Sequence, residues 1–212
     1  MLKLAISADG KAGAAGGKPI AITEEAARER VHLLRAHSDA VMVGIGTVLA
    51  DDPMLTCRLP GMANASPVRI VADSMLRLPV SSRLVRSAYE TPVWALTGLA
   101  APQDSELILL PLGVEVLRSP QSAGRLGLKD GLEFLAAKGI TRLMVEGGPT
   151  LAAAFVAADL VDEAVLFHSP KIVGADGVDA LATDAMEALT RRLKQVSSAP
   201  FGTDRQVNYA RE

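Results

Sequence analysis

Apolar and polar positions follow two alternating patterns along the chain, and these predict strands and helices in turn. Short apolar runs are typical of buried strands, whereas apolar residues spaced three and four apart indicate amphipathic helices. Runs of the first kind predict strands at residues 2–8, 40–43, 68–72, 93–96, 114–117, 142–145 and 163–167. Spacing of the second kind predicts helices at residues 24–36, 131–137 and 151–158.

This order predicts an α/β fold with a mostly parallel central sheet flanked by helices, because parallel neighbouring strands need crossover connections. Residues 192–197 and 205–209 are typical of two extended segments without a helix between them, which predicts antiparallel C-terminal strands. The Gly- and Ala-rich segment 9–17 is expected to hold no long regular structure and to approach a ligand closely. We expect residues 1–212 to form a single domain.

Charge and residue content narrow the functional classes. A net charge of −2 without a basic stripe disfavours a nucleic-acid partner, and no run of about 18 apolar residues predicts a membrane span. Cys57 is the single cysteine, which excludes an internal disulfide and fits a cytoplasmic protein. His32, His37 and His168 lack metal-ligand spacing, so we expect no metal. No Gly-x-Ser-x-Gly elbow or Walker lysine loop occurs, which disfavours hydrolases and kinases.

The turn after strand 142–145 carries the first candidate chemistry, because ligands of open parallel sheets bind beyond the carboxyl ends of the strands. Its glycines permit unusual backbone angles, and Pro149 suits a first helical position. The amides of Thr150, Leu151 and Ala152 are expected to lack partners there, which makes a seat for a pyrophosphate. An ordinary strand-to-helix turn is the alternative.

Glu146 precedes this turn and is placed to accept hydrogen bonds from a ligand, unless it is a solvated loop glutamate. The earlier turn at residues 44–47 fails the dinucleotide fingerprint, since Leu49 stands where a third glycine is needed. This disfavours an ordinary Rossmann enzyme. The hydroxyl and amide groups around Thr47 are candidates for contacts with phosphate or ribose.

Segment 51–58 combines two acids with Arg58, whose guanidinium could anchor a phosphorylated substrate together with Arg35. Alternatively, Arg35 neutralises its own helix end and Arg58 pairs with a nearby acid. Beyond strand 68–72, Ser74 and Arg77 offer a hydroxyl and a cation for an adenosine 2′-phosphate, which favours NADPH over NADH.

Five ordered blocks resemble one known family: KLAISADGKAG from Lys3, SDAVMVGIGTVLADDPMLTCR from Ser38, PVRIVADS from Pro67, EGGPTL from Glu146 and PKIVGADG from Pro170. It is the C-terminal reductase domain of the riboflavin biosynthesis deaminase/reductase RibD. The resemblance implies a three-layer dihydrofolate-reductase-like fold, a homodimer, and NADPH-dependent reduction of 5-amino-6-(5-phosphoribosylamino)uracil to 5-amino-6-(5-phosphoribitylamino)uracil.

The resemblance also implies roles for individual residues. The NADPH contacts that it implies are Ala5, Ala21, Thr47, Asp51, Ser74, Gly148, Pro149, Thr150, Leu151, Ala152, Ala153 and Ala154. The substrate contacts that it implies are Pro19, Arg35, Leu55, Arg58 and Glu146. Lys3 and Glu146 are the candidate catalytic residues; for the proton donor, Asp51 and a bound water are further candidates.

Two departures from the family pattern are visible. Pro19-Ile20-Ala21 stands where many relatives carry Ser-x-Trp, and the zinc pattern of the deaminase half is absent. We therefore expect the deaminase to come from a separate protein or from a missing N-terminal domain. Two alternatives remain: a related reductase of another pteridine or pyrimidine, including dihydrofolate, and a nucleotide-binding protein without turnover.

Overall fold

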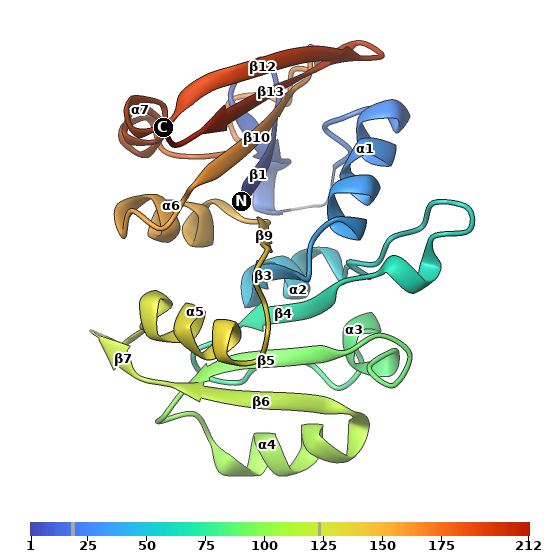
Figure 1. Cartoon of the computed structure of the whole chain (residues 1–212), viewed down its shortest axis with the longest axis vertical. Helices are drawn as coiled ribbons and strands as arrows, with labels where there is room; N and C mark the ends of the chain where they lie inside the picture. The colour runs from blue at the N-terminus through green and yellow to red at the C-terminus, as the bar shows by residue number, and fades with distance from the viewer. Residues whose placement is uncertain (18–19, 123) are drawn as a thin grey trace. The chain divides into compact units, whose positions relative to one another are not determined.

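The computed structural model describes residues 1–17, 20–122 and 124–212 (Figure 1). The chain divides into two compact units. Unit 1 comprises residues 1–32 and 144–212, and unit 2 comprises residues 33–143. Helix α1 (Glu25–Ala36) begins in unit 1 and ends in unit 2.

Unit 1 is built on a sheet in which the order of strands is β12, β13, β10, β1 and β9. β1 is parallel to both of its neighbours, whereas β13 is antiparallel to β10 and to β12. The bounds of the strands are β1 (Leu2–Ile6), β9 (Leu143–Glu146), β10 (Glu163–His168), β12 (Lys194–Phe201) and β13 (Asp204–Ala210). The helices are α6 (Pro149–Ala157) and α7 (Thr183–Arg192), with a 3-10 turn, η1 (Ala15–Gly17).

Unit 2 contains four parallel strands in the order β3, β4, β5 and β6. Their bounds are β3 (Ala40–Gly44), β4 (Val68–Ala72), β5 (Val93–Gly98) and β6 (Val114–Ser119). The helices and 3-10 turns are α2 (Ile45–Asp51), α3 (Arg83–Arg86), α4 (Gln103–Leu109), α5 (Leu128–Ala137), η2 (Ala63–Ala65) and η3 (Leu110–Leu112). β7 (Gln121–Ser122) and β8 (Arg125–Leu126) form a hairpin. The predicted α/β class, with mostly parallel strands and an antiparallel C-terminal pair, is confirmed.

Segment 9–17 holds no long regular structure, as expected: its one strand, β2 (Lys11–Gly13), has three residues and pairs with β11 (Val178–Asp179). Two other local expectations were wrong. Strand β1 ends at Ile6 because Ser7 already belongs to the turn that leads into β2. The first predicted C-terminal strand starts late, since residue 192 is the last residue of α7, a helix that the sequence pattern did not reveal.

Strand β3 is apolar on both faces, as expected of a parallel strand between other elements. Val41, Met42 and Val43 of β3 are fully buried. Helix α5 packs on β5 through Gly131, where a Cβ atom would lie 2.8 Å from Leu96 Cδ2. Only a glycine permits this close approach, so it fixes α5 against the strand.

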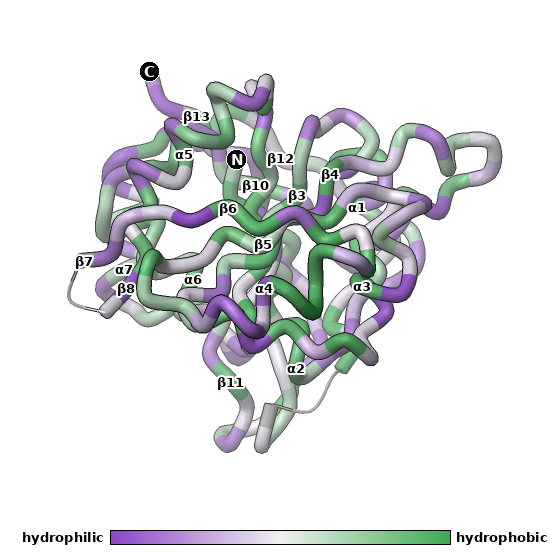
Figure 2. The backbone as a smooth tube through the Cα atoms, turned by 90° about the horizontal axis from the view of Figure 1, so that it is seen from below, coloured by the Kyte–Doolittle hydropathy of each residue, from purple (hydrophilic) through white to green (hydrophobic). Residues whose placement is uncertain are grey.

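The end of helix α4 and η3, residues 107–112, form a hydrophobic stretch of the chain (Figure 2). Leu109 is buried, whereas Leu107, Ile108 and Leu110 are exposed. Even with this stretch, no helix among residues 1–17, 20–122 and 124–212 has both the length and the apolar character needed to span a membrane.

The last strand of the sheet in unit 1, β12, is irregular. Its register against β13 shifts between Gln195 and Ser197, which marks a β-bulge, and Pro200 lies near its end. Proline has no N–H to donate to a ladder and is confined to sheet edges, so its position agrees with the place of β12 in the strand order.

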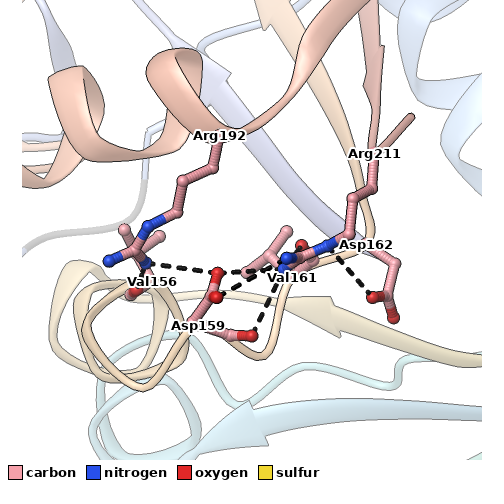
Figure 3. A network of polar contacts seen from close by, with 6 residues as sticks. All are labelled: Val156, Asp159, Val161, Asp162, Arg192 and Arg211. Atoms are coloured by element: carbon pink, nitrogen blue, oxygen red, sulfur yellow. Dashed lines mark hydrogen bonds and ion pairs between the residues drawn. The ribbon is translucent and has the colours of Figure 1, made fainter.

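Asp159 is the centre of an ionic network that fixes the turn after α6 (Figure 3). Its carboxylate lies 2.9 Å from Nη2 of Arg211 and 3.4 Å from Nη1 of Arg192. Arg211 also donates to the Val161 carbonyl at 3.0 Å. The Arg211 hydrogen bond holds the pKa of Asp159 below its ordinary value. With φ at 56°, Asp159 occupies the left-handed region, which Asp and Asn tolerate better than most residues.

We predict that Asp159→Asn reduces the stability of the protein at neutral pH and flattens its dependence on pH in acid. The folded pKa of Asp159 is lowered from 3.8, so its charge stabilises the fold above that pH and the contribution is lost as the pH falls through the folded value. Thermal unfolding between pH 2 and 7 measures this. Asn keeps the left-handed backbone, so Asp159→Ala is the matched comparison and should be less stable still. An unchanged pH profile in Asp159→Asn contradicts the prediction.

Candidate active site

The predicted site residues are distributed over both units. Unit 1 carries the residues Lys3, Ala5, Ala21, Glu146 and those of the segment 148–154. Unit 2 carries Arg35, Thr47, Asp51, Leu55, Arg58 and Ser74. Pro19 lies outside the described residues.

Lys3 and Glu146 form an ion pair in unit 1. The two residues are directly opposite in the parallel pairing of β1 with β9, and Lys3 Nζ lies 3.3 Å from Glu146 Oε1. Their side chains are only 12% and 13% exposed. Glu146 is therefore not a solvated loop glutamate. The pair places an ammonium donor and a carboxylate acceptor side by side, where each charge offsets part of the cost of burying the other.

The turn from β9 into α6 exposes backbone donors. Gly147 has a φ of 138°, which side chains other than glycine rarely adopt, and Gly148 is the N-cap. Pro149 occupies the first turn, as predicted. The expectation for Ala152 was wrong, because its amide donates to the Gly148 carbonyl at 3.3 Å as the first bond of the helix. The amides of Thr150 and Leu151 precede that bond and have no acceptor within the helix.

Asp9, which the sequence reasoning passed over, organises the turn after β1. Its carboxylate accepts hydrogen bonds from Ser7 Oγ at 2.6 Å and from the amides of Val173 and Gly174 at 3.1 and 2.7 Å. These hydrogen bonds lower the pKa of the Asp9 carboxyl to about 2, and the bond from Ser7 has the largest effect. Ser7 Oγ in turn accepts from the Lys11 amide at 2.7 Å. The Ser-x-Asp sequence directly after a buried strand was the signal available for this network.

Ala21 lies near the same turn. Lys171, which is two residues beyond Ser169 at the end of β10, donates from Nζ to the Ala21 carbonyl at 2.6 Å. The backbone of Ala8 donates to the Lys171 carbonyl at 2.8 Å. Lys171 thus links the segment before α1 to the turn that follows β1.

In unit 2, Arg35 contacts the segment that carries Arg58. Arg35 is 8% exposed, and its Nη1 donates to the Thr56 carbonyl at 3.1 Å. Leu55 and Cys57 are buried, whereas Arg58 is exposed. The two arginines that were predicted to bind one anion are therefore connected through a single loop. Neutralising the end of α1 is not the only role of Arg35.

The two acids at the end of α2 have different surroundings. Asp52 adopts a left-handed conformation at the C-cap, and its Oδ1 accepts from the Arg83 amide at 2.8 Å. Asp51 is the last residue of α2 and is exposed, although desolvation by neighbouring atoms raises the pKa of its carboxyl. Thr47 lies one turn earlier and is half-buried. The Asp52 carboxylate thus holds the start of α3 through the Arg83 amide, and Asp51 is the acid that could contact a ligand.

The segment after β4 holds Asp73, Ser74 and Arg77 in different surroundings. Asp73 is fully buried, and its Oδ1 lies 3.5 Å from Nε of Arg77. Ser74 is half-buried, and its carbonyl accepts from the Gly98 amide at 3.2 Å. The cation expected for a 2′-phosphate is therefore already paired with a carboxylate. A role for Arg77 in choosing NADPH stays a prediction.

Comparisons with known proteins agree on one family. The model of the family described as RibD C-terminal domain matches residues 1–207. The 2,5-diamino-6-ribosylamino-4(3H)-pyrimidinone 5′-phosphate reductase of Methanothermobacter thermautotrophicus is 37% identical over 219 residues, with 99% of this chain and 96% of the relative covered. The riboflavin biosynthesis protein RibD of Actinobacillus pleuropneumoniae is 39% identical over 174 residues, covering 82% of this chain and 46% of the relative.

Solved structures give the same result. Acinetobacter baumannii RibD superposes with a TM-score of 0.81 at 28% identity, covering 100% of this chain and 57% of that one. The chain thus spans about half the length of the RibD proteins that it matches.

We predict that Lys3→Met or Glu146→Leu alone lowers the free energy of unfolding by about 1–3 kcal/mol, because each leaves a mostly buried charge without its partner. The double variant should cost less than the sum of the two. Urea unfolding measures all three. Lys194→Met is the control, since its pair with Glu212 is exposed and should contribute little. If the double variant loses as much free energy of unfolding as the two single variants together, the two charges are not coupled.

Proposed function

The chain belongs to the family of RibD C-terminal domains, and on that premise we propose that it is an NADPH-dependent reductase of a phosphoribosylaminopyrimidine in riboflavin biosynthesis. The proposed reaction reduces 5-amino-6-(5-phosphoribosylamino)uracil to 5-amino-6-(5-phosphoribitylamino)uracil. The Lys3–Glu146 pair is the observation that carries the proposal, because it joins the two residues that the family pattern assigns to the reacting end of the substrate.

A second substrate has specific support. The relatives that are similar to this chain over most of their own length, from Methanothermobacter thermautotrophicus and Archaeoglobus fulgidus, are named as reductases of 2,5-diamino-6-ribosylamino-4(3H)-pyrimidinone 5′-phosphate. The two pyrimidines differ at the ring position that carries an amino group in one and a carbonyl in the other. A site with Glu146 near the base could favour either one, since a carboxylate accepts from ring or exocyclic NH groups.

The backbone donors at the start of α6 fit a dinucleotide. A helix N-terminus attracts phosphate through its amides and its dipole, and Gly148 supplies no capping side chain to occupy the amides of Thr150 and Leu151. The small side chains of Ala153 and Ala154 lie in the same helix and are half-buried. We assign this segment to the pyrophosphate, with Ala5, Ala21, Thr47, Asp51 and Ser74 as further cofactor contacts.

The substrate phosphate is assigned to Arg35 and Arg58. A guanidinium offers paired donors that match the oxygens of a phosphate. Arg35 is held at the carbonyl of Thr56, a residue two positions before Arg58 in the chain. Leu55 belongs to the same segment and completes the substrate contacts proposed in unit 2.

The hydride is supplied by the nicotinamide when the cofactor is bound, so the protein has to orient the substrate and manage protons. The Lys3 ammonium carries three donors, one of which is used by Glu146. We propose that Glu146 orients both Lys3 and the substrate, and that Lys3 donates a hydrogen bond to the ribose ring oxygen. This oxygen takes up a proton when its bond to C1 breaks, and C1 receives the hydride. Asp51, whose pKa is raised by desolvation, is the alternative proton donor.

Three further properties are proposed with this function. The family resemblance implies a homodimer, a cytoplasmic location, and a deaminase that is supplied by a separate protein or by another part of a longer chain. No metal, nucleic acid or membrane takes part in the proposed reaction.

The test is a coupled assay with purified protein, NADPH and the two pyrimidine phosphates, one of them made in place by a deaminase. We expect substrate-dependent oxidation of NADPH, faster than that of NADH. Mass spectrometry of the ribityl product confirms the reaction. Tight binding of NADPH without oxidation in the presence of either pyrimidine would instead favour a nucleotide-binding protein without turnover. Oxidation with dihydrofolate alone would favour the related-reductase alternative.

Arg58→Ala should raise the KM for the pyrimidine phosphate by about 10- to 100-fold, because it removes a charged fork from the substrate phosphate. The Kd for NADPH should change by less than about twofold. Steady-state kinetics and titration of NADPH fluorescence measure the two values. Arg125→Ala is the matched control, since it removes another exposed guanidinium of unit 2. A large loss of NADPH affinity in Arg58→Ala would overturn the assignment.

A further inference from the structure

Arg69 is a fully buried arginine in the second position of β4. Its guanidinium donates to the carbonyl of Met54 at 3.3 Å, to the carbonyl and Oγ of Ser87 at 2.9 and 2.8 Å, and to the carbonyl of Thr91. Three of these four acceptors are backbone carbonyls and the fourth is a hydroxyl. Among the residues that the structure describes, none of the hydrogen-bond acceptors of this cation is a carboxylate, and Glu90 acts on it only through its charge.

A buried cation of this kind is costly to the fold. Burial lowers the pKa of Arg69 to about 10, which reflects the loss of hydration around the guanidinium. An apolar side chain would fill the same place in a parallel strand at lower cost. What Arg69 adds is the set of carbonyls that it holds, and one of these belongs to the segment that carries Arg58.

The contact with Met54 acts on a strained peptide. Leu55 follows Met54 directly and has a φ of 56°, a left-handed conformation that a leucine adopts only when its surroundings impose it. The carbonyl of Met54 belongs to the peptide bond that joins these two residues. A hydrogen bond to that carbonyl therefore fixes the orientation of the strained peptide.

Other contacts hold the same segment further along. Arg35 donates to the Thr56 carbonyl at 3.1 Å, and Ser66 Oγ accepts from the Cys57 amide at 3.1 Å. Leu55 and Cys57 are buried, which anchors alternate side chains below the surface. Arg58 follows immediately and is exposed. Among these contacts, that of Arg69 is the one at the strained peptide.

We propose that Arg69 is a positioning residue for the substrate: by fixing the Met54–Leu55 peptide from beneath, it holds Leu55 and Arg58 in the arrangement that receives the substrate phosphate. This inference rests on the proposed function of Arg58. It assigns to the buried arginine of β4 a role that acts through the loop and needs no contact with either ligand.

Cys57 provides a direct probe of the loop, because it is the only cysteine and is buried within it. Under native conditions, Arg69→Met should speed the reaction of Cys57 with a thiol reagent by about tenfold through local opening of the segment. Leu189→Ala, in α7 of unit 1, is the control for global stability because it removes a buried side chain elsewhere. If the labelling rates simply follow the unfolding temperatures of the variants, the proposal is overturned.

A double-mutant cycle with Arg58 tests the link to the substrate. Arg69→Met alone should raise the KM for the pyrimidine phosphate by about tenfold and leave the Kd for NADPH within about twofold. In the Arg58→Ala background it should raise KM by a clearly smaller factor, because Leu55 is then the only proposed substrate contact left for Arg69 to position. Additive effects would mean that Arg69 acts on the whole fold and would overturn the proposal.

Arg69→Lys covers the case in which Arg69→Met fails to fold. Lysine keeps the charge but cannot reach the same set of carbonyls with its single ammonium. Like Arg69→Met, Arg69→Lys should therefore speed the labelling of Cys57 and raise the substrate KM, but by smaller factors. Unchanged values in a folded Arg69→Lys overturn the proposal. If Arg58→Ala itself leaves the substrate KM unchanged while Arg69→Met alters Cys57 labelling, the assignment of Arg58 in the proposed function is at fault.

Discussion

The parallel pairing of β1 with both β9 and β10 is the constraint on which the chemistry of unit 1 depends. Parallel strands end at the same edge of a sheet, so the turns that follow these three strands emerge together. The bonds from the amides of Val173 and Gly174 to Asp9 are direct evidence of this meeting. The same pairing sets Lys3 opposite Glu146. One choice of strand neighbours therefore determines both the ion pair and the loops around it.

The strands of unit 2 are also parallel, but the loop that follows α2 is held by side chains. The four strands are parallel, and the long segment after α2 returns to the start of β4 without regular structure before η2. Such a segment cannot satisfy its backbone by a ladder, so side chains take over that role. Arg35, Ser66 and Arg69 each bond one of its backbone groups. Polar side chains that look available in the sequence thus also support the backbone of this segment.

The sequence pattern predicted what depends on local preference and missed what depends on neighbours in space. The apolar runs located the main strands, and Glu146 stood out because it follows one of them. The partnership of Lys3 with Glu146 could not be foreseen, since it requires the strand order. Likewise, the pairing of Arg77 with buried Asp73 depends on a turn whose backbone path the pattern does not define. The start of α6 at Pro149 was placed correctly, but the amide of Ala152 was misjudged because it already makes the first hydrogen bond of the helix.

The irregular strand β12 has a consequence for how copies of the chain meet one another. An open sheet edge is a template on which another strand can add, and repeated addition leads to fibres. The bulge between Gln195 and Ser197 interrupts that template, and Pro200 removes one of its donors. The sheet of unit 1 therefore ends in a strand that resists extension. The edge formed by β12 is therefore a poor template for edge-to-edge addition of a second copy of the chain.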